Sequence, residues 1–144
     1  MYHIFEHFFL AQSLYEKKVL PVCQKFGLTY MEFTVLMFLA NHPQYDTAAQ
    51  IVKIRHLTKS HVSVSLRTLQ EKQLVEGMYY PGNRKNLHLK VTDAAHPIVQ
   101  EGRKAQKAFS EILVRDFTPE EAAQLKYLIE KLENNMKQEN NIHE

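Results

Sequence analysis

The chain has 144 residues, of which 44% are hydrophobic and 24% charged, and its formal net charge is +2. This length suits one domain with a real core, and no apolar run approaches the roughly 18 residues that a membrane span needs. The apolar N-terminus, interrupted by Glu6 and His7, lacks the basic start and the cleavage site of a signal peptide and is predicted to belong to the fold. A single cysteine, Cys23, excludes an internal disulfide framework and fits a reducing cytoplasm.

Charge is distributed unevenly along the chain. Eight lysine and arginine residues stand against two acids between Thr47 and Thr92, whereas residues 111–144 carry four cations and eight acids. A concentrated basic segment is typical of a protein that meets a polyanion, although a solvated basic surface would give the same count.

Capping residues predict the helix boundaries. Gly27 is predicted to close a first helix, and Thr29 with Glu32 has the spacing of a capping box at the start of a second, which runs through MEFTVLMFLA to a break at NHPQYD. Asp46 is the predicted N-cap of a third helix, TAAQIVKIR, and Thr58 that of a fourth, KSHVSVSLRTLQEKQL. Three helices therefore follow the first in quick succession.

The fourth helix has one apolar face. Val62, Leu66 and Leu69 recur at helical spacing and are predicted to face the core. The residues left on or near its outside are Lys59, Ser60, His61, Ser63, Val64, Arg67 and Thr68.

Strand patterns follow this helix. The segments LVEGMYY and LHLKVT are rich in β-branched, aromatic and alternating residues, and they flank a predicted turn from Pro81 to Asn86. Together they predict a small antiparallel hairpin, two- or three-stranded, whose tip carries Arg84 and Lys85.

Two helices are predicted after the hairpin. The first begins near Thr92 or Asp93 and ends at about Asp116, with Pro97 tolerated in its first turn. The last opens on TPEE with Thr118 as N-cap, and its polar tail NNMKQENNIHE is predicted to fray. Its apolar stripe comprises Ala122, Leu125, Leu128, Ile129, Leu132 and Met136.

The two ends of the chain have more apolar surface than a small core covers. The first helix has apolar residues on more than one face, among them Phe5, Phe8, Phe9 and Leu10. We expect the terminal helices to interlock with those of a second copy, because twofold pairing is the commonest oligomer. The alternative is that these helices pack only on their own core.

Three helices followed by a hairpin is the order of a winged helix-turn-helix. In that fold the fourth helix would enter the DNA major groove, and Arg84 and Lys85 on the wing would contact phosphates or the minor groove. Two alternatives stay open: Arg67 could form a surface ion pair with Glu71, and the hairpin tip could be merely solvated.

The segments TYMEFTVLMFLANHP, LTKSHVSVSLRTLQEKQLVE and NRKNLHLKVT resemble the MarR family of bacterial transcription regulators, and the resemblance covers nearly all of the chain. It implies a cytoplasmic homodimer, with dimerisation helices in residues 1–28 and 93–144 and a DNA-binding lobe in residues 29–92. It also implies a pseudo-palindromic operator on double-stranded DNA and a repressor that a small aromatic or lipophilic effector releases.

Several positions depart from the family pattern. Asn83 replaces the usual Asp at the wing tip, and Lys85 stands where a wing arginine is common, which predicts a looser tip or a weaker minor-groove contact. Val64 replaces a frequent basic residue and favours contact with a thymine methyl group. Gln73 and Ala95 occupy positions where glycines are common.

The resemblance places an effector between the dimerisation helices and the lobe. His7, Tyr15, Tyr30 and Phe33 are candidate lining residues by type alone, and core packing is the alternative for each aromatic one. His3 and His7 have metal-ligand spacing, with Cys23 or His42 as conceivable further ligands, but no second His-x-x-x-His follows the wing, so no metal or other cofactor is predicted.

No enzyme pattern is present: the chain has four glycines, no phosphate loop and no nucleophile elbow. Two competing functions remain. The winged helix could serve as a protein-protein interaction module, or it could bind DNA constitutively without an effector.

Overall fold

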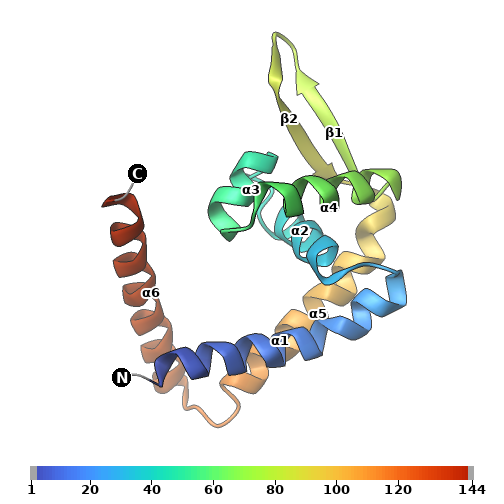
Figure 1. Cartoon of the computed structure of the whole chain (residues 1–144). Helices are drawn as coiled ribbons and strands as arrows, with labels where there is room; N and C mark the ends of the chain where they lie inside the picture. Colours follow the sequence, from blue (N-terminus) through green and yellow to red (C-terminus); the bar gives the residue numbers. More distant parts are fainter. Residues whose placement is uncertain (1–2, 143–144) are drawn as a thin grey trace. The chain divides into compact units, whose positions relative to one another are not determined.

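Helices make up most of the chain, and one hairpin interrupts them (Figure 1). A computed structural model describes residues 3–142. In chain order the elements are α1 (Ile4–Phe26), α2 (Tyr30–Asn41), α3 (Ala48–Arg55), α4 (Lys59–Glu71), β1 (Val75–Tyr80), β2 (Asn83–Val91), the short 3-10 helix η1 (Asp93–Ala95), α5 (His96–Leu113) and α6 (Pro119–Ile142). This order confirms the predicted mainly α fold with a two-stranded antiparallel hairpin.

The contacts divide the chain into two compact units, one ending at Phe109 and the other beginning at Ser110. The first unit holds α1 to β2 and most of α5, and the second holds α6. The sequence predicted one compact chain. The apolar side chains along α6 are largely exposed.

Most helix ends lie where the capping residues predicted them. Gly27 closes α1 in the left-handed conformation at φ 65°, and its N–H donates to carbonyls of the last turn. Thr29 and Glu32 form the predicted capping box at the start of α2, with both hydrogen bonds at 3.1 Å. Thr58 caps α4 by accepting the His61 N–H at 3.3 Å.

The predicted cap of α3 was wrong by one residue. Thr47, not Asp46, is the N-cap: its Oγ1 accepts the Gln50 N–H at 3.3 Å, and Gln50 Oε1 accepts the Thr47 N–H at 3.1 Å. The two form a second capping box. The Asp46 carboxylate is occupied elsewhere, because it accepts from His88 on β2.

The fourth helix ends three residues earlier than predicted, at Glu71. Gln73 then takes the left-handed conformation at φ 59°, which turns the chain into β1. Glycine adopts this conformation at least cost, and glycine is common here in the family that the sequence resembles.

The hairpin turn is tighter than predicted. Only Pro81 and Gly82 separate the strands, so β2 begins at Asn83 rather than after Asn86. The pairing is regular from Val75 opposite Val91 to Met78 opposite His88, and then shifts so that Tyr80 pairs with Asn83. The shift leaves several extra residues on β2, and Arg84 and Lys85 lie among them.

The core of the first unit forms around α2, whose residues from Glu32 to Leu39 are all buried. Val62, Leu66 and Leu69 of α4 are buried against it, as predicted. In Figure 1, α5 crosses α1; the ring of Tyr15 meets that of Phe109 edge to face, with centroids 5.3 Å apart.

Gly102 lets α5 pack closely against side chains of α2. A Cβ added there would lie 2.6 Å from Met37 Sδ and 3.0 Å from the Phe33 ring, and both side chains are fully buried. Gly102→Ala is therefore expected to lower the free energy of unfolding by about 1–3 kcal/mol. Urea denaturation measures the change in the free energy of unfolding. A decrease supports the close packing, because Gly→Ala in an open helix would instead raise the free energy of unfolding by about 0.5–1 kcal/mol.

The last helix starts as predicted and runs further. Thr118 and Glu121 form the capping box, with hydrogen bonds of 2.9 and 3.2 Å. The helix continues to Ile142, and the fraying expected from Asn134 onwards stays a prediction; His143 and Glu144 lie outside the described residues. α5 ends at Leu113, before the predicted Asp116.

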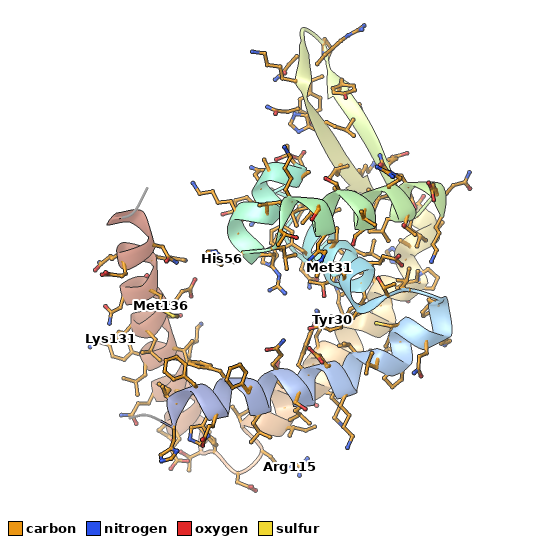
Figure 2. The ribbon with its side chains drawn as sticks, in the orientation of Figure 1. Tyr30, Met31, His56, Arg115, Lys131 and Met136 are labelled. Atoms are coloured by element: carbon orange, nitrogen blue, oxygen red, sulfur yellow. The ribbon has the colours of Figure 1, made fainter. Side chains whose placement is uncertain are left out.

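Apolar side chains are exposed on both terminal helices. Phe5, Phe8, Phe9 and Leu10 of α1 are each more than half exposed, so the first part of α1 does not pack on the core of its own unit. On α6 the exposed residues include Leu128, Ile129, Leu132 and Met136, the last of which is labelled in Figure 2. None of the described helices is long and apolar enough to cross a membrane.

Candidate nucleic-acid interface

The outer face of α4 is open to solvent. Lys59, Ser60, His61, Ser63, Val64 and Arg67 are all exposed, and Thr68 is half-buried with its hydroxyl donating to the Val64 carbonyl at 3.3 Å. Because the three apolar residues of α4 hold the opposite face in the core, this face is free to meet a ligand along most of its length. Within residues 3–142, Arg67 forms no ion pair with Glu71, so its guanidinium is available.

The N-terminus of α4 is suited to binding an anion. Its free backbone N–H groups and the positive end of its dipole lie next to Lys59 and Ser60, and no acid occupies the first turn. Phosphate oxygens are the anions that DNA presents to such a helix end.

The wing tip carries two exposed cations, Arg84 and Lys85. Asn83 Oδ1 accepts the backbone N–H of Lys85 at 3.1 Å. The residue that departs from the family pattern therefore binds the tip backbone, and this contact opposes the loosening that the sequence led us to expect.

The helix α4 and the hairpin meet around one groove of about 490 Å³. Figure 1 shows the hairpin projecting from the lobe, with α3 and α4 at its base. Lys59 and Ser63 of α4 and Lys85 of β2 line the groove, so three residues singled out from the sequence come together there. The remaining lining residues are Thr47, Ala48, Ala49, Val52, Asn86 and Leu87.

Residues 26–77, which run from the end of α1 into β1, match the model of the MarR family. This segment contains α2, α3 and all of α4. The central part of the chain is therefore similar to the MarR family. The resemblance predicted from the sequence is thereby confirmed. None of the curated proteins matches the sequence at a significant level.

Solved structures of MarR proteins share the fold. A putative MarR family transcriptional regulator from Listeria monocytogenes, complexed with 26mer DNA, is 17% identical with a TM-score of 0.81, covering 93% of this chain and 88% of that one. A Staphylococcus aureus MarR in complex with salicylate and kanamycin is 18% identical with a TM-score of 0.78, covering 95% and 92%. A mutant MepR from a multidrug resistant S. aureus clinical isolate is 22% identical with a TM-score of 0.74, covering 94% and 99%.

One anchor of α4 was missed from the sequence. Lys72, directly after α4, donates to the Gly27 carbonyl at 2.6 Å, and its Nζ lies 3.6 Å from Glu32 Oε2. The end of α4 is thus tied to the junction of α1 and α2. No sequence signal predicts this contact, because its partners lie far away along the chain.

The candidate effector residues do not gather at one cavity. Tyr15 lines a crevice of about 90 Å³ in the first unit, whereas Phe33 is fully buried in the core and His7 is exposed. Core packing was therefore the correct alternative for Phe33. The other lining residues of the crevice are Thr34, Met37, Phe38, Asn41, His42, Arg55 and Gln106.

Polar contacts close one side of this crevice. Gln106 of α5 donates to the Tyr15 hydroxyl at 3.0 Å and accepts from Asn41 at 3.1 Å. Tyr30, labelled in Figure 2, is half-buried at the start of α2, and burial raises the pKa of its phenol, with Tyr15 and Glu16 adding to the effect. The phenol therefore stays neutral and can both donate and accept a hydrogen bond.

The histidines do not assemble a ligand cluster in the described residues. His3 Nδ1 contacts Glu6 at 3.1 Å, and residues 3–142 contain no group of three or more His, Cys, Asp or Glu side chains placed to hold a metal ion.

Cys23 is expected to be inert in the folded protein. The side chain is 2% exposed, and burial raises the pKa of its thiol, with the Glu32 carboxylate adding to the shift. Because the thiolate is the reactive form, a raised pKa lowers reactivity at any given pH. We expect a chromogenic disulfide reagent at about pH 8 to label Cys23 only as fast as the protein opens, and immediately in urea. Rapid labelling of the native protein would contradict this prediction.

Proposed function

We propose that this chain is a DNA-binding transcription regulator of the MarR type that acts in the cytoplasm as a homodimer and represses its target until an effector releases it. The groove lined by Lys59, Ser63 and Lys85 carries the proposal, because it joins the open face of α4 to a basic wing on a MarR-type lobe. The Listeria relative, which shares the fold, is complexed with DNA. The proposal assigns no catalytic role to any residue.

The DNA contacts divide by residue type. Lys59, Ser60 and Ser63 are assigned to phosphates at the start of the major-groove helix. His61, Val64, Arg67 and Thr68 are assigned to base edges, with Val64 suited to a thymine methyl group. Arg84 and Lys85, with Asn83 holding the tip, are assigned to the phosphates or the minor groove beside the wing.

Dimerisation supplies the geometry for an operator. We assign residues 29–92 to the DNA-binding lobe and residues 1–28 and 93–144 to dimerisation, since the exposed apolar side chains of α1 and α6 need cover. Two copies of α4 about 34–36 Å apart would read two half-sites one helical turn apart on a pseudo-palindrome.

An effector is proposed at the crevice between α1, α2 and α5. A small aromatic or lipophilic molecule that enlarges this crevice would separate Gln106 from Tyr15 and Asn41, and would shift α1 and α5 relative to the lobe. Such a ligand lowers DNA affinity only by its preference for the shifted state. The S. aureus MarR relative is complexed with salicylate.

Salt-dependent DNA binding tests the proposal. Purified protein is titrated onto a duplex of its own upstream region and onto a random duplex, at about 50 and 200 mM salt. Several phosphate contacts per subunit predict a loss of affinity on the order of 10³ or more over this range. If the protein ignores both duplexes at low salt, the interaction-module hypothesis becomes the better one.

Thermal shifts separate a regulated from a constitutive DNA binder. The panel comprises phenolic acids, lipophilic drugs and zinc, each at a concentration well above its expected Kd. A compound that raises Tm and weakens DNA binding supports the effector proposal, because ligands stabilise the state they bind. A flat response across the panel favours the constitutive alternative.

A further inference from the structure

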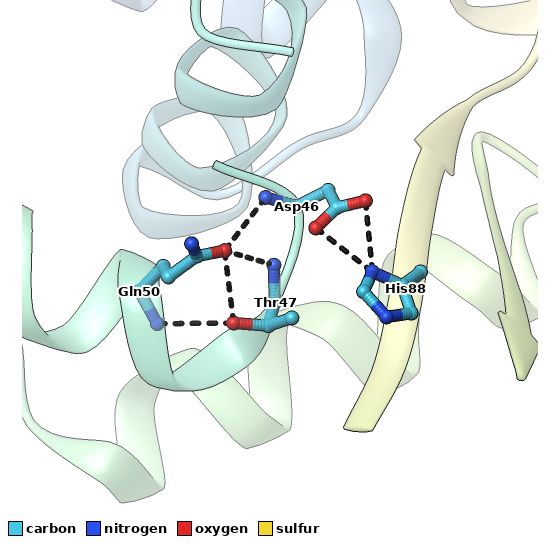
Figure 3. Close-up of polar contacts among 4 residues, drawn as sticks. All are labelled: Asp46, Thr47, Gln50 and His88. Carbon is cyan, nitrogen blue, oxygen red and sulfur yellow. Dashed lines mark hydrogen bonds and ion pairs between the residues drawn. The ribbon is translucent and has the colours of Figure 1, made fainter. Parts of the chain in front are cut away.

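Asp46 and His88 join the wing to the lobe (Figure 3). His88 Nδ1 on β2 lies 3.0 Å from both carboxylate oxygens of Asp46, in the loop that precedes α3. A carboxylate only accepts hydrogen bonds, so Nδ1 must carry the hydrogen and donate. Both side chains are mostly covered, at 20% and 26% exposure for His88 and Asp46, which shields the contact from competing water.

Two further contacts hold the same point. The backbone N–H of Leu89 donates to the Asp46 carbonyl at 2.7 Å, so Asp46 binds β2 through both its main chain and its side chain. On the other side, the Tyr80 ring stacks on the His88 ring, with centroids 3.9 Å apart and an interplanar angle of 17°. The imidazole is therefore fixed between the opposite strand and the lobe.

The Asp46–His88 contact lies at the end of the regularly paired part of the wing. His88 pairs with Met78, the last regular pair before the register shifts, and Arg84 and Lys85 follow in the irregular part of β2. An isolated two-stranded hairpin is only marginally stable and has no fixed direction of its own. Contacts at the end of its regular ladder therefore decide where its tip points.

The other end of the contact is the beginning of α3. Asp46 directly precedes Thr47, the N-cap of α3, and its own N–H donates to Gln50 Oε1 at 3.0 Å within the same capping arrangement (Figure 3). The wing is thus attached to the start of α3, the helix that packs on α4. A displacement of β2 at His88 relative to the start of α3 must stretch the Asp46–His88 contact.

We propose that Asp46 and His88 are positioning residues for DNA binding: they form a clamp that orients the wing, so that Arg84 and Lys85 reach DNA while α4 lies in the major groove. The inference rests on the proposed DNA-binding function. The clamp residues do not contact DNA themselves, since each side chain is engaged by the other and mostly covered. With the clamp open, the wing must be ordered when DNA binds, and that ordering costs affinity.

The test compares Asp46→Ala with Asp46→Asn. Both changes remove one negative charge, which by itself favours DNA binding, but only asparagine keeps an oxygen that accepts from His88. We expect Asp46→Ala to weaken binding to the operator duplex by about 10-fold, and Asp46→Asn to stay within about twofold of wild type. His88→Phe, which keeps the ring stacked on Tyr80 but has no donor, should behave like Asp46→Ala. Circular dichroism and Tm verify that each variant is folded.

A double-mutant cycle separates positioning of the wing from general support of the lobe. In a background of Arg84→Ala and Lys85→Ala, the wing tip carries neither cation, so its orientation no longer affects DNA binding. In this background Asp46→Ala should change DNA affinity by less than about twofold. An equal loss in both backgrounds would overturn the clamp, as would binding by Asp46→Ala at the wild-type level. Wild-type protein that binds no duplex at low salt would instead overturn the proposed DNA-binding function, on which the clamp depends.

Discussion

Replacing Arg84 and Lys85 together with alanine is expected to weaken DNA binding by about 10- to 100-fold near 100 mM salt. Both side chains are exposed at the wing tip, where Asn83 holds the backbone. A dimer would lose four cations, so the slope of log affinity against log salt should fall in magnitude by about 3 to 4 if each cation meets a phosphate. Fluorescence anisotropy at several salt concentrations measures both quantities.

A matched control removes the same charge elsewhere on the first unit. Lys17 of α1 and Lys104 of α5 are exposed and do not belong to α4 or the wing. The double variant Lys17→Ala, Lys104→Ala should keep nearly the wild-type salt slope. If both double variants lose affinity equally, the effect comes from net charge alone, and the wing has no specific role.

Placing glutamates at Leu128 and Leu132 is expected to convert the dimer to monomer at micromolar concentration. Both leucines belong to the exposed stripe of α6, and in an interface each new carboxylate would lose its water without gaining a partner. Sedimentation velocity measures the change. DNA affinity should fall by at least about 100-fold, because a dimer gains its second half-site at a high effective concentration that a monomer lacks.

The control for this prediction places the same charges on the opposite face of α6. Ala123 and Asn134 are exposed and lie across the helix from the leucine stripe by helical spacing. Ala123→Glu with Asn134→Glu should stay dimeric. A Leu128→Glu, Leu132→Glu protein that remains dimeric and binds its operator would exclude the stripe from the dimer interface and leave α1 as the candidate.

Local chemistry in the sequence was sufficient for most of the fold. Gly27, Thr29, Thr58 and Thr118 marked helix ends correctly, because caps satisfy backbone groups within a few residues of themselves. Periodicity identified the buried face of α4, and hence its open face. The basic hairpin after three short helices was enough to predict a winged helix-turn-helix, whereas the resemblance to the MarR family rested on the residues of three segments.

The errors arose where a distant partner competes for a residue. Asp46 is as good a cap as Thr47 by residue type, but His88, 42 residues away, takes its carboxylate, and the cap moves to Thr47. Phe33 lies in the core, the placement that the sequence favoured over a ligand pocket, and the close approach of α5 at Gly102 covers its ring. Neither the Asp46–His88 contact nor the packing of α5 on Phe33 produces a periodic pattern in the sequence.

The sequence by itself determined where most helices of this protein lie, which face of α4 is open and where the basic residues are found along the chain, since these depend on neighbours within a turn or two. The tertiary structure alone decided how those residues come together: Lys59, Ser63 and Lys85 around one groove, Lys72 on the α1–α2 junction, and His88 on Asp46. The reason is physical. Contacts between side chains that are tens of residues apart exist only after the core has brought their backbones together.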